Sequence, residues 1–112
     1  MHITRFGEAE PYDAPRHFGM QALRLQGAGK GPLKGAACGF SIFAPNGGAE
    51  RSASQLHRVY IVLSGAITIS IEGEDHLLRP HDSCYIPAGE ARALKNREAE
   101  PCEMLVFTIE EA

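Results

Sequence analysis

Short apolar runs, separated by turn-forming residues, constrain the fold of this chain more than any other feature. No long stretch keeps its apolar side chains at the i, i+3, i+4 spacing of a helix without an interrupting Gly or Pro. Gly supplies positive φ and Pro fixes φ, so breaks such as 27–35, 45–48 and 87–89 favour turns. The pattern therefore predicts an all-β sandwich or barrel. The predicted strands are 17–26, 38–44, 55–63, 66–72, 76–78, 83–86, 91–94 and 102–109.

Composition limits the classes of function. A chain of 112 residues, 44% of them hydrophobic, fits one soluble globular domain. Its net charge of -3 and its scattered Lys and Arg give no basis for nucleic-acid binding. No segment is apolar over the ~18 residues that a membrane span needs, and the N-terminus lacks the apolar run of a secretory signal, so we expect a cytoplasmic protein. Cys38, Cys84 and Cys102 fit no zinc spacing and are predicted to be reduced thiols.

The N-terminal residues differ from the rest. Residues 1–16 are polar and carry Pro11 and Pro15, which predicts an extended arm, and residues 17–112 are predicted to form one barrel domain. Tyr12 and His17 are functional side chains in an unusual place, and we expect them to anchor a dimer or to cap the pocket of the barrel.

The segment 79–96 carries a specific motif. It predicts a turn, a short strand, a second tight turn and another strand. Its spacing resembles the second signature of the cupin superfamily, which is Gly, five residues, Pro-x-Gly, two residues, His, three residues, Asn. Pro87, Gly89 and Asn96 match that pattern, whereas His81 replaces the leading Gly and Arg92 replaces the metal-binding His.

The stretch Tyr-Ile-Val-Leu-Ser-Gly at 60–65 is similar to the end of the first signature of that family. The two signatures together cover 48–96. The resemblance implies a small single-domain cupin, an RmlC-like jelly roll, also described as a double-stranded β-helix. In that family a divalent metal commonly lies inside the barrel between two His, a Glu and a third His.

None of the four implied ligands is present in this sequence. Counting back from Gly65, the Glu position falls on Arg58, and the last His position falls on Arg92. The remaining two positions fall on Arg51 and Ala53, or on Ser52 and Ser54. Guanidinium groups stay protonated and offer no lone pair to a metal, but they bind carboxylate or phosphate through two parallel hydrogen bonds. The alternative is that these arginines lie at the barrel mouth in salt bridges with Glu50, Glu90 or Glu98.

Three further side chains are candidates for the same pocket. Tyr60 is available for acid–base chemistry. Strand alternation places His57 opposite to Arg58, unless a bulge turns it inward to bind a metal with Cys84 or another His. If Cys84 faces Arg92, a neighbouring guanidinium would depress the pKa of its thiol, and the alternative is an inert core cysteine.

The sequence thus predicts a barrel that binds a small anionic metabolite at Arg58, Arg92, Tyr60, Cys84 and His57, without a metal or other cofactor. One alternative is a metal-dependent cupin enzyme of isomerase, lyase, decarboxylase or dioxygenase type that uses unconventional ligands such as His57. Another is a non-catalytic structural module, since one fold hosts many functions. Strands that are apolar on both faces predict a homodimer. No catalytic residue is assigned.

Overall fold

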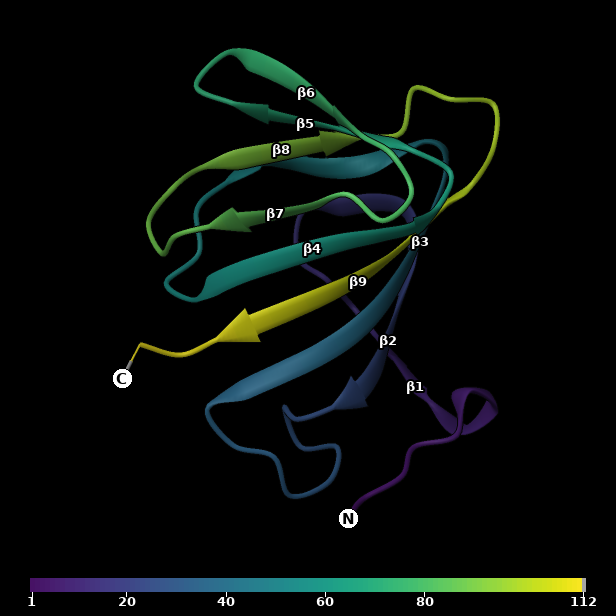
Figure 1. Cartoon of the computed structure of the whole chain (residues 1–112), viewed down its shortest axis with the longest axis vertical. Coiled ribbons are helices and arrows are strands. Elements are labelled where there is room, and N and C mark those ends of the chain that lie inside the picture. Colours follow the sequence, from purple (N-terminus) through teal and green to yellow (C-terminus); the bar gives the residue numbers. More distant parts are fainter. Residues whose placement is uncertain (112) are drawn as a thin grey trace.

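The computed structural model describes residues 1–111, which form antiparallel strands almost throughout (Figure 1). Within these residues the one helical element is the three-residue turn η1 (Phe6–Glu8), and no helix could cross a membrane. The strands are β1 (Glu10–Tyr12), β2 (His17–Gln26), β3 (Ala36–Ser52), β4 (His57–Ser64), β5 (Ile67–Ile71), β6 (Glu74–Leu78), β7 (Ser83–Ile86), β8 (Arg92–Lys95) and β9 (Cys102–Ile109). The all-β prediction is confirmed.

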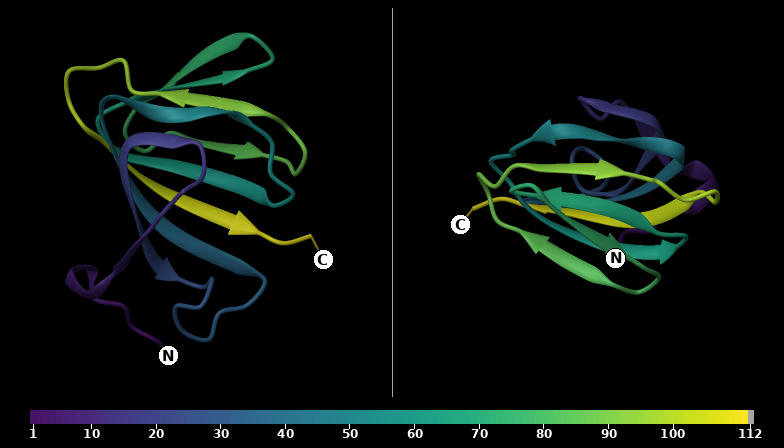
Figure 2. Two further views of the ribbon diagram at one scale, coloured as in Figure 1. Left: turned by 180° about the vertical axis from the view of Figure 1, so that it is seen from behind. Right: turned by 90° about the horizontal axis from the view of Figure 1, so that it is seen from above.

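The strands form one strongly curved sheet in the order β6-β5-β8-β3-β9-β4-β7, with β2 on the other edge of β3 and β1 beside β2. All of the pairings are antiparallel. The sheet curls into a nearly closed barrel, and the N-terminal segment crosses it on one side, in front in the left view of Figure 2. The turn pattern predicted a sandwich or barrel, and this barrel is the jelly roll that the cupin resemblance implied.

Strand β3 serves two parts of the barrel. Its first half pairs with β9 and its second half pairs with β8, while β2 lies along both. The change of partner occurs near Asn46, whose φ is 70°, and Gly47, where a Cβ would lie 2.1 Å from the carbonyl oxygen of Gly19. The sequence predicted that residues 45–48 end a strand and reverse the chain, and this prediction is wrong. Gly and Asn produce a bend here, and the strand continues.

The core is formed by alternate residues of the strands. Along β4, Arg58, Tyr60 and Val62 are buried, whereas the residues between them are more exposed. The buried apolar cluster comprises Phe43, Ala49, Tyr60, Val62, Ile67, Ile69, Leu78, Ile86, Leu94, Cys102 and Met104. One end of the barrel is thus filled with apolar side chains, and the charged residues Arg58 and Arg92 mark where that filling stops.

Asn96 holds the end of β8 against β3. It is fully buried, and its side-chain amide donates hydrogen bonds to the carbonyls of Phe43 (3.1 Å) and Glu100 (2.9 Å). Its side-chain carbonyl accepts a bond from the backbone N–H of Glu98 at 2.9 Å. A buried amide with its donors and acceptor paired specifies one loop geometry, which explains why Asn occurs at this point of the motif.

The turn residues behave as their types predict. His81, at the position where the motif has Gly, has a φ of 73°, and Gly89 has a φ of 88°. A histidine in the left-handed region is uncommon but tolerated in a turn.

The N-terminal arm has more structure than an extended tail: β1 pairs with β2 in the register Glu10↔Arg24 and Tyr12↔Ala22.

Candidate functional site

A cavity of about 300 Å³, here called the barrel cavity, opens beyond the apolar core. Strands β2, β3, β4, β8 and β9 form its walls, and the segment before β2 lies across its mouth. No acidic side chain lines it among the described residues. Its lining consists of Tyr12, Ala14, Pro15, Arg16, His17, Met20, Ser41, Phe43, Ser52, Ala53, Ser54, Arg58, Tyr60, Arg92, Leu94, Met104, Val106 and Thr108.

Arg92 forms one wall of the barrel cavity and is 4% exposed. Its Nε–H donates to the hydroxyl of Tyr60 at 2.9 Å, and its Nη1 donates to Ser52 Oγ at 3.1 Å and to the carbonyl of Glu50 at 3.4 Å. Its Nη2 makes no hydrogen bond to any described residue. The guanidinium is therefore fixed in orientation by neutral acceptors while keeping donors available to a ligand.

Arg58 faces it from β4 and is 6% exposed. Its guanidinium makes a long hydrogen bond from Nη2 to the carbonyl of Glu90 at 3.4 Å and lies near the Tyr60 hydroxyl, but its buried Nε has no partner among residues 1–111. Burial lowers the pKa of Arg58 from its usual value, and repulsion from Arg92 adds to that effect, whereas Tyr60 opposes it. A buried guanidinium with an unpartnered N–H is costly unless something outside the chain satisfies it.

The two arginines do not form the salt bridges that the alternative reading required. Glu50 and Glu90 contribute backbone carbonyls, and no described carboxylate lies within ion-pair distance of Arg58 or Arg92. Both side chains lie inside the barrel instead. The cavity consequently concentrates positive charge with no internal counter-charge.

His17, which was expected from the sequence to anchor a dimer or to cap the pocket, lines the barrel cavity, although it is not among the five predicted ligand-binding residues. It comes from the first residue of β2, and its Nδ1 lies 2.8 Å from the carbonyl of Pro15. A carbonyl accepts only, so Nδ1 carries the proton and Nε2 keeps its lone pair in the neutral ring. Burial lowers the pKa of His17, and the positive charges of Arg92 and Arg58 lower it further, against the effect of the Pro15 carbonyl. The signal in the sequence was its place at a strand start, beside a Pro-rich arm.

These side chains do not fit a divalent metal. Ser52, Ala53 and Ser54 form the wall where the family would place its pair of His, and Arg51 is exposed. Residues 1–111 contain no group of three His, Cys, Asp or Glu side chains close enough to hold an ion. Two buried guanidinium groups would also repel a cation. The same charges attract an anion.

His57 and Cys84 lie away from the barrel cavity. His57 points outward, where its Nδ1 lies 2.7 Å from the hydroxyl of Tyr85 and its Nε2 contacts the carboxylate of Glu111. Cys84 packs against the apolar core. Of the two possibilities left open for this thiol, the structure favours the inert core cysteine: burial raises the pKa of Cys84, against the lowering effects of a backbone hydrogen bond at Tyr60 and of the charge of Arg58. The ligand-binding role of all five predicted residues stays a prediction.

Comparisons with known proteins agree with this architecture. The family model described as "Cupin domain" matches residues 39–108. A protein of Mycobacterium tuberculosis named Beta-D-galactosidase Rv1717 is 33% identical over 106 residues, which cover 95% of this chain and 91% of that protein. Among solved structures, the polyketide cyclase RemF from Streptomyces resistomycificus superposes with a TM-score of 0.86 at 17% identity, over 99% of this chain and 80% of that one. An RmlC-like cupin from Shewanella frigidimarina gives 0.80 at 14% identity, over 99% and 92% of the two chains.

Proposed function

Given that the chain belongs to the cupin family, we propose that its barrel cavity binds a small anionic metabolite without a metal. One observation carries the proposal: Arg58 and Arg92 hold unpartnered donors in a cavity whose described lining contains no acidic side chain. A carboxylate would satisfy those donors and neutralise the charge. A planar guanidinium group binds a carboxylate better than the ammonium group of Lys does, because it can donate two parallel hydrogen bonds.

The test is ligand-induced thermal stabilisation of the wild-type protein and of Arg92→Ala. Small carboxylates should stabilise the wild type, and the matching neutral amides should not. Arg92→Ala should weaken binding by at least about thirtyfold, since removing one partner of a buried charged contact costs about 2–5 kcal/mol. Arg79→Ala removes an exposed charge and is the matched control. If a broad panel of carboxylates stabilises the wild type no more than the amides do, the proposal fails.

A second candidate is a proton-transfer enzyme that acts on the bound anion, and His17 favours it. A neutral imidazole with a free Nε2 is a suitable general base at neutral pH. In this role His17 would take a proton from the carbon next to the carboxylate and return it at another position, which is an isomerisation without a co-reactant. Exchange of that hydrogen for deuterium in D₂O, lost in His17→Gln with binding retained, would distinguish an enzyme from a binding protein.

The name of the mycobacterial relative makes a β-galactoside the first neutral ligand to test. Most glycoside hydrolases flank the scissile bond with two carboxyl side chains. The described lining of the barrel cavity supplies none, so hydrolysis of that type has no support here. Release of nitrophenol from a nitrophenyl β-galactoside, abolished in Arg92→Ala, would replace the anion proposal.

Two further predictions concern assembly and metal. We propose a homodimer, because several outward side chains on the strands are large and apolar, including Leu63 and Ile109. Light scattering that shows a monomer at micromolar concentration would contradict it.

Metal analysis of the purified protein tests the absence of a metal. A divalent metal that is retained stoichiometrically through chelation would support the metalloenzyme alternative and contradict the metal-free proposal.

A further inference from the structure

Two further hollows follow the barrel cavity, and each shares lining residues with its neighbour. A second space of about 320 Å³, the middle hollow, shares Tyr12, Val106 and Thr108 with the barrel cavity. A third of about 440 Å³, the outer hollow, shares Ala28, Ala37, Leu56 and Thr108 with the middle hollow. Thr108 borders all three. The three spaces therefore border one another in this order, and together they are here called the groove.

The strand register explains why the floor of the middle hollow is open. Thr108 of β9 pairs with Arg58 on one side and with Ala37 of β3 on the other. Two residues along, Val106 pairs with Tyr60 and with Gly39 in the same way. Residues two apart on a strand share a face, so the face that carries Arg58 and Tyr60 continues onto β3 with its smallest side chains.

Tyr12 stands between the barrel cavity and the middle hollow. Its ring lies under the guanidinium of Arg24, whose central carbon is 4.0 Å from the ring centroid, and burial raises the pKa of its hydroxyl. Its hydroxyl is so close to β3 that a Cβ on Gly39 would lie 3.2 Å from it. The absence of a side chain at Gly39 therefore leaves room for the ring of Tyr12 and for the passage beside it.

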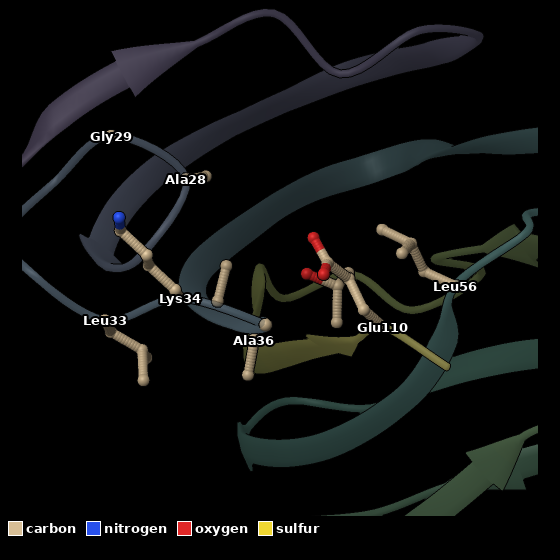
Figure 3. Close-up of a pocket in the computed structure, with 10 residues that line it drawn as sticks. Ala28, Gly29, Leu33, Lys34, Ala36, Leu56 and Glu110 are labelled. Atoms are coloured by element: carbon tan, nitrogen blue, oxygen red, sulfur yellow. The ribbon is translucent and has the colours of Figure 1, made fainter. Parts of the chain in front are cut away.

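The chemical character changes along the groove. The inner end is cationic, through Arg58 and Arg92. The middle hollow is walled by the small or apolar residues Ala28, Ala37, Cys38, Gly39, Leu56 and Val106, with Thr108, Tyr12 and Arg24 at its edges. In the outer hollow, Figure 3 shows Leu33 and Lys34 on one side and Leu56 and Glu110 on the other.

We propose that the ligand is an extended carboxylate with an apolar body. This rests on the proposed function: the carboxylate lies in the barrel cavity, and the body passes Tyr12 into the middle hollow and ends near Leu33. The cavity alone has a volume at the lower limit of small-molecule sites, whereas the groove accommodates a longer molecule. An oligosaccharide fits less well, because Arg24 is stacked on Tyr12 and the walls of the middle hollow offer few other polar side chains.

A chain-length series tests the proposal. The probes are straight-chain monocarboxylates from acetate to decanoate, titrated below their micelle concentrations and followed by NMR. The barrel cavity holds roughly ten water-sized volumes of ~30 Å³, so hexanoate already fills much of it. Affinity should continue to rise beyond that length, by roughly fourfold for each buried methylene. A plateau at hexanoate would overturn the extended ligand while leaving the anion site intact.

Variants of the groove test the route. Ala37→Phe fills the passage beside Thr108 and should abolish the gain from octanoate to decanoate. Ala44→Phe, at an exposed position of the same strand, is the matched control and should keep that gain. Leu33→Asp, in an exposed loop, should weaken decanoate more than hexanoate, and it serves if Ala37→Phe does not fold. An unchanged gain in folded Ala37→Phe or in Leu33→Asp would overturn the route.

The outcomes separate the two proposals. If no carboxylate of any length binds, the anion site itself is wrong. If acetate binds in an Arg92-dependent manner but longer chains bind no better, the anion site stands and the extended ligand is wrong. If oligomers of a uronic acid gain affinity with length and alkyl carboxylates do not, the groove holds a sugar chain and the apolar body is wrong.

Discussion

The two walls of the barrel cavity carry the same charged group in different states. On the wall formed by β8 and β3, Arg92 donates to three neutral acceptors. On the wall formed by β4, the guanidinium of Arg58 has a long hydrogen bond and a buried Nε without a partner. Arg92 is thus a built-in part of the folded state, whereas Arg58 is buried at a cost that the described residues do not offset.

This difference between Arg92 and Arg58 shows how a folded protein can keep hydrogen-bond donors both oriented and available for a ligand. A fully satisfied pair of arginines would have no reason to bind an anion, and two unsatisfied arginines would have no fixed geometry. One arginine oriented by the protein and one left in need of a partner give both orientation and affinity. The stability of the ligand-free protein, measured in a buffer without carboxylate, phosphate or sulfate, tests that division.

The largest effect is expected for Arg92→Met. The substitution leaves the buried Tyr60 hydroxyl without its donor, and also the part-buried Ser52 hydroxyl and Glu50 carbonyl. We expect the free energy of unfolding to fall by about 2–3 kcal/mol, since each abandoned buried group costs about 1–3 kcal/mol and removal of the charge returns part of this. Urea denaturation measures the change. A variant as stable as the wild type would mean that these hydrogen bonds do not fix Arg92.

Arg58→Met should act in the opposite direction. It removes a buried charge that has no counter-ion and lies near Arg92, and it replaces the charge with an apolar side chain of similar length. We expect the free energy of unfolding to rise by about 1–2 kcal/mol, because an apolar substitute for a poorly paired buried ion is often stabilising. The same variant should lose anion binding. Destabilisation by this substitution would contradict the asymmetry between the walls.

Much of the fold could be predicted because its signals are local. The strands 17–26, 83–86 and 102–109 were predicted with their observed bounds, since turn residues with positive φ or fixed φ flank them. The continuous β3 was missed, because Gly and Pro at 45–48 give the same signal for a bend as for a reversal. Only the pairing of β3 with both β9 and β8 distinguishes the two.

The site was predictable where strand alternation applies and not elsewhere. Alternation placed Arg58 and Tyr60 on one face of β4 and His57 on the other, as the structure has them. The cap formed by Tyr12 and His17 was one of two expectations left open, and the groove past Tyr12 was not predicted. They depend on how a segment before β2 crosses the barrel, and no local pattern encodes a long-range contact of that kind.

A smaller effect is expected from pH, through His17. Its pKa is lowered in the folded protein, so below the ordinary value of 6.5 the unfolded chain binds a proton that the native chain does not. Stability should therefore fall as the pH drops from 7.5 through 6.5 to 5.5. Urea denaturation at these three values should show a shallower dependence for His17→Gln. The carboxyl of Asp75, whose pKa is lowered by its bonds to Ser70 and Arg97, acts at more acidic pH and leaves this window unaffected.

The smallest effect is expected for His57→Ala. His57 lies outside the cavity, so this variant shows whether contacts at the surface matter as much as those of the buried arginines. His57 also makes several contacts, with Tyr85, Glu111 and the backbone N–H of Ala88. These partners are exposed or close to solvent, so water replaces them at little cost, and the free energy of unfolding should change by about 0.5 kcal/mol or less. Carboxylate binding should remain unchanged, because the side chain faces away from Arg58. If His57→Ala weakens binding as Arg92→Ala does, then the outer face of β4 belongs to the site. The number of contacts would then matter more than their burial, which is the opposite of what the two walls indicate.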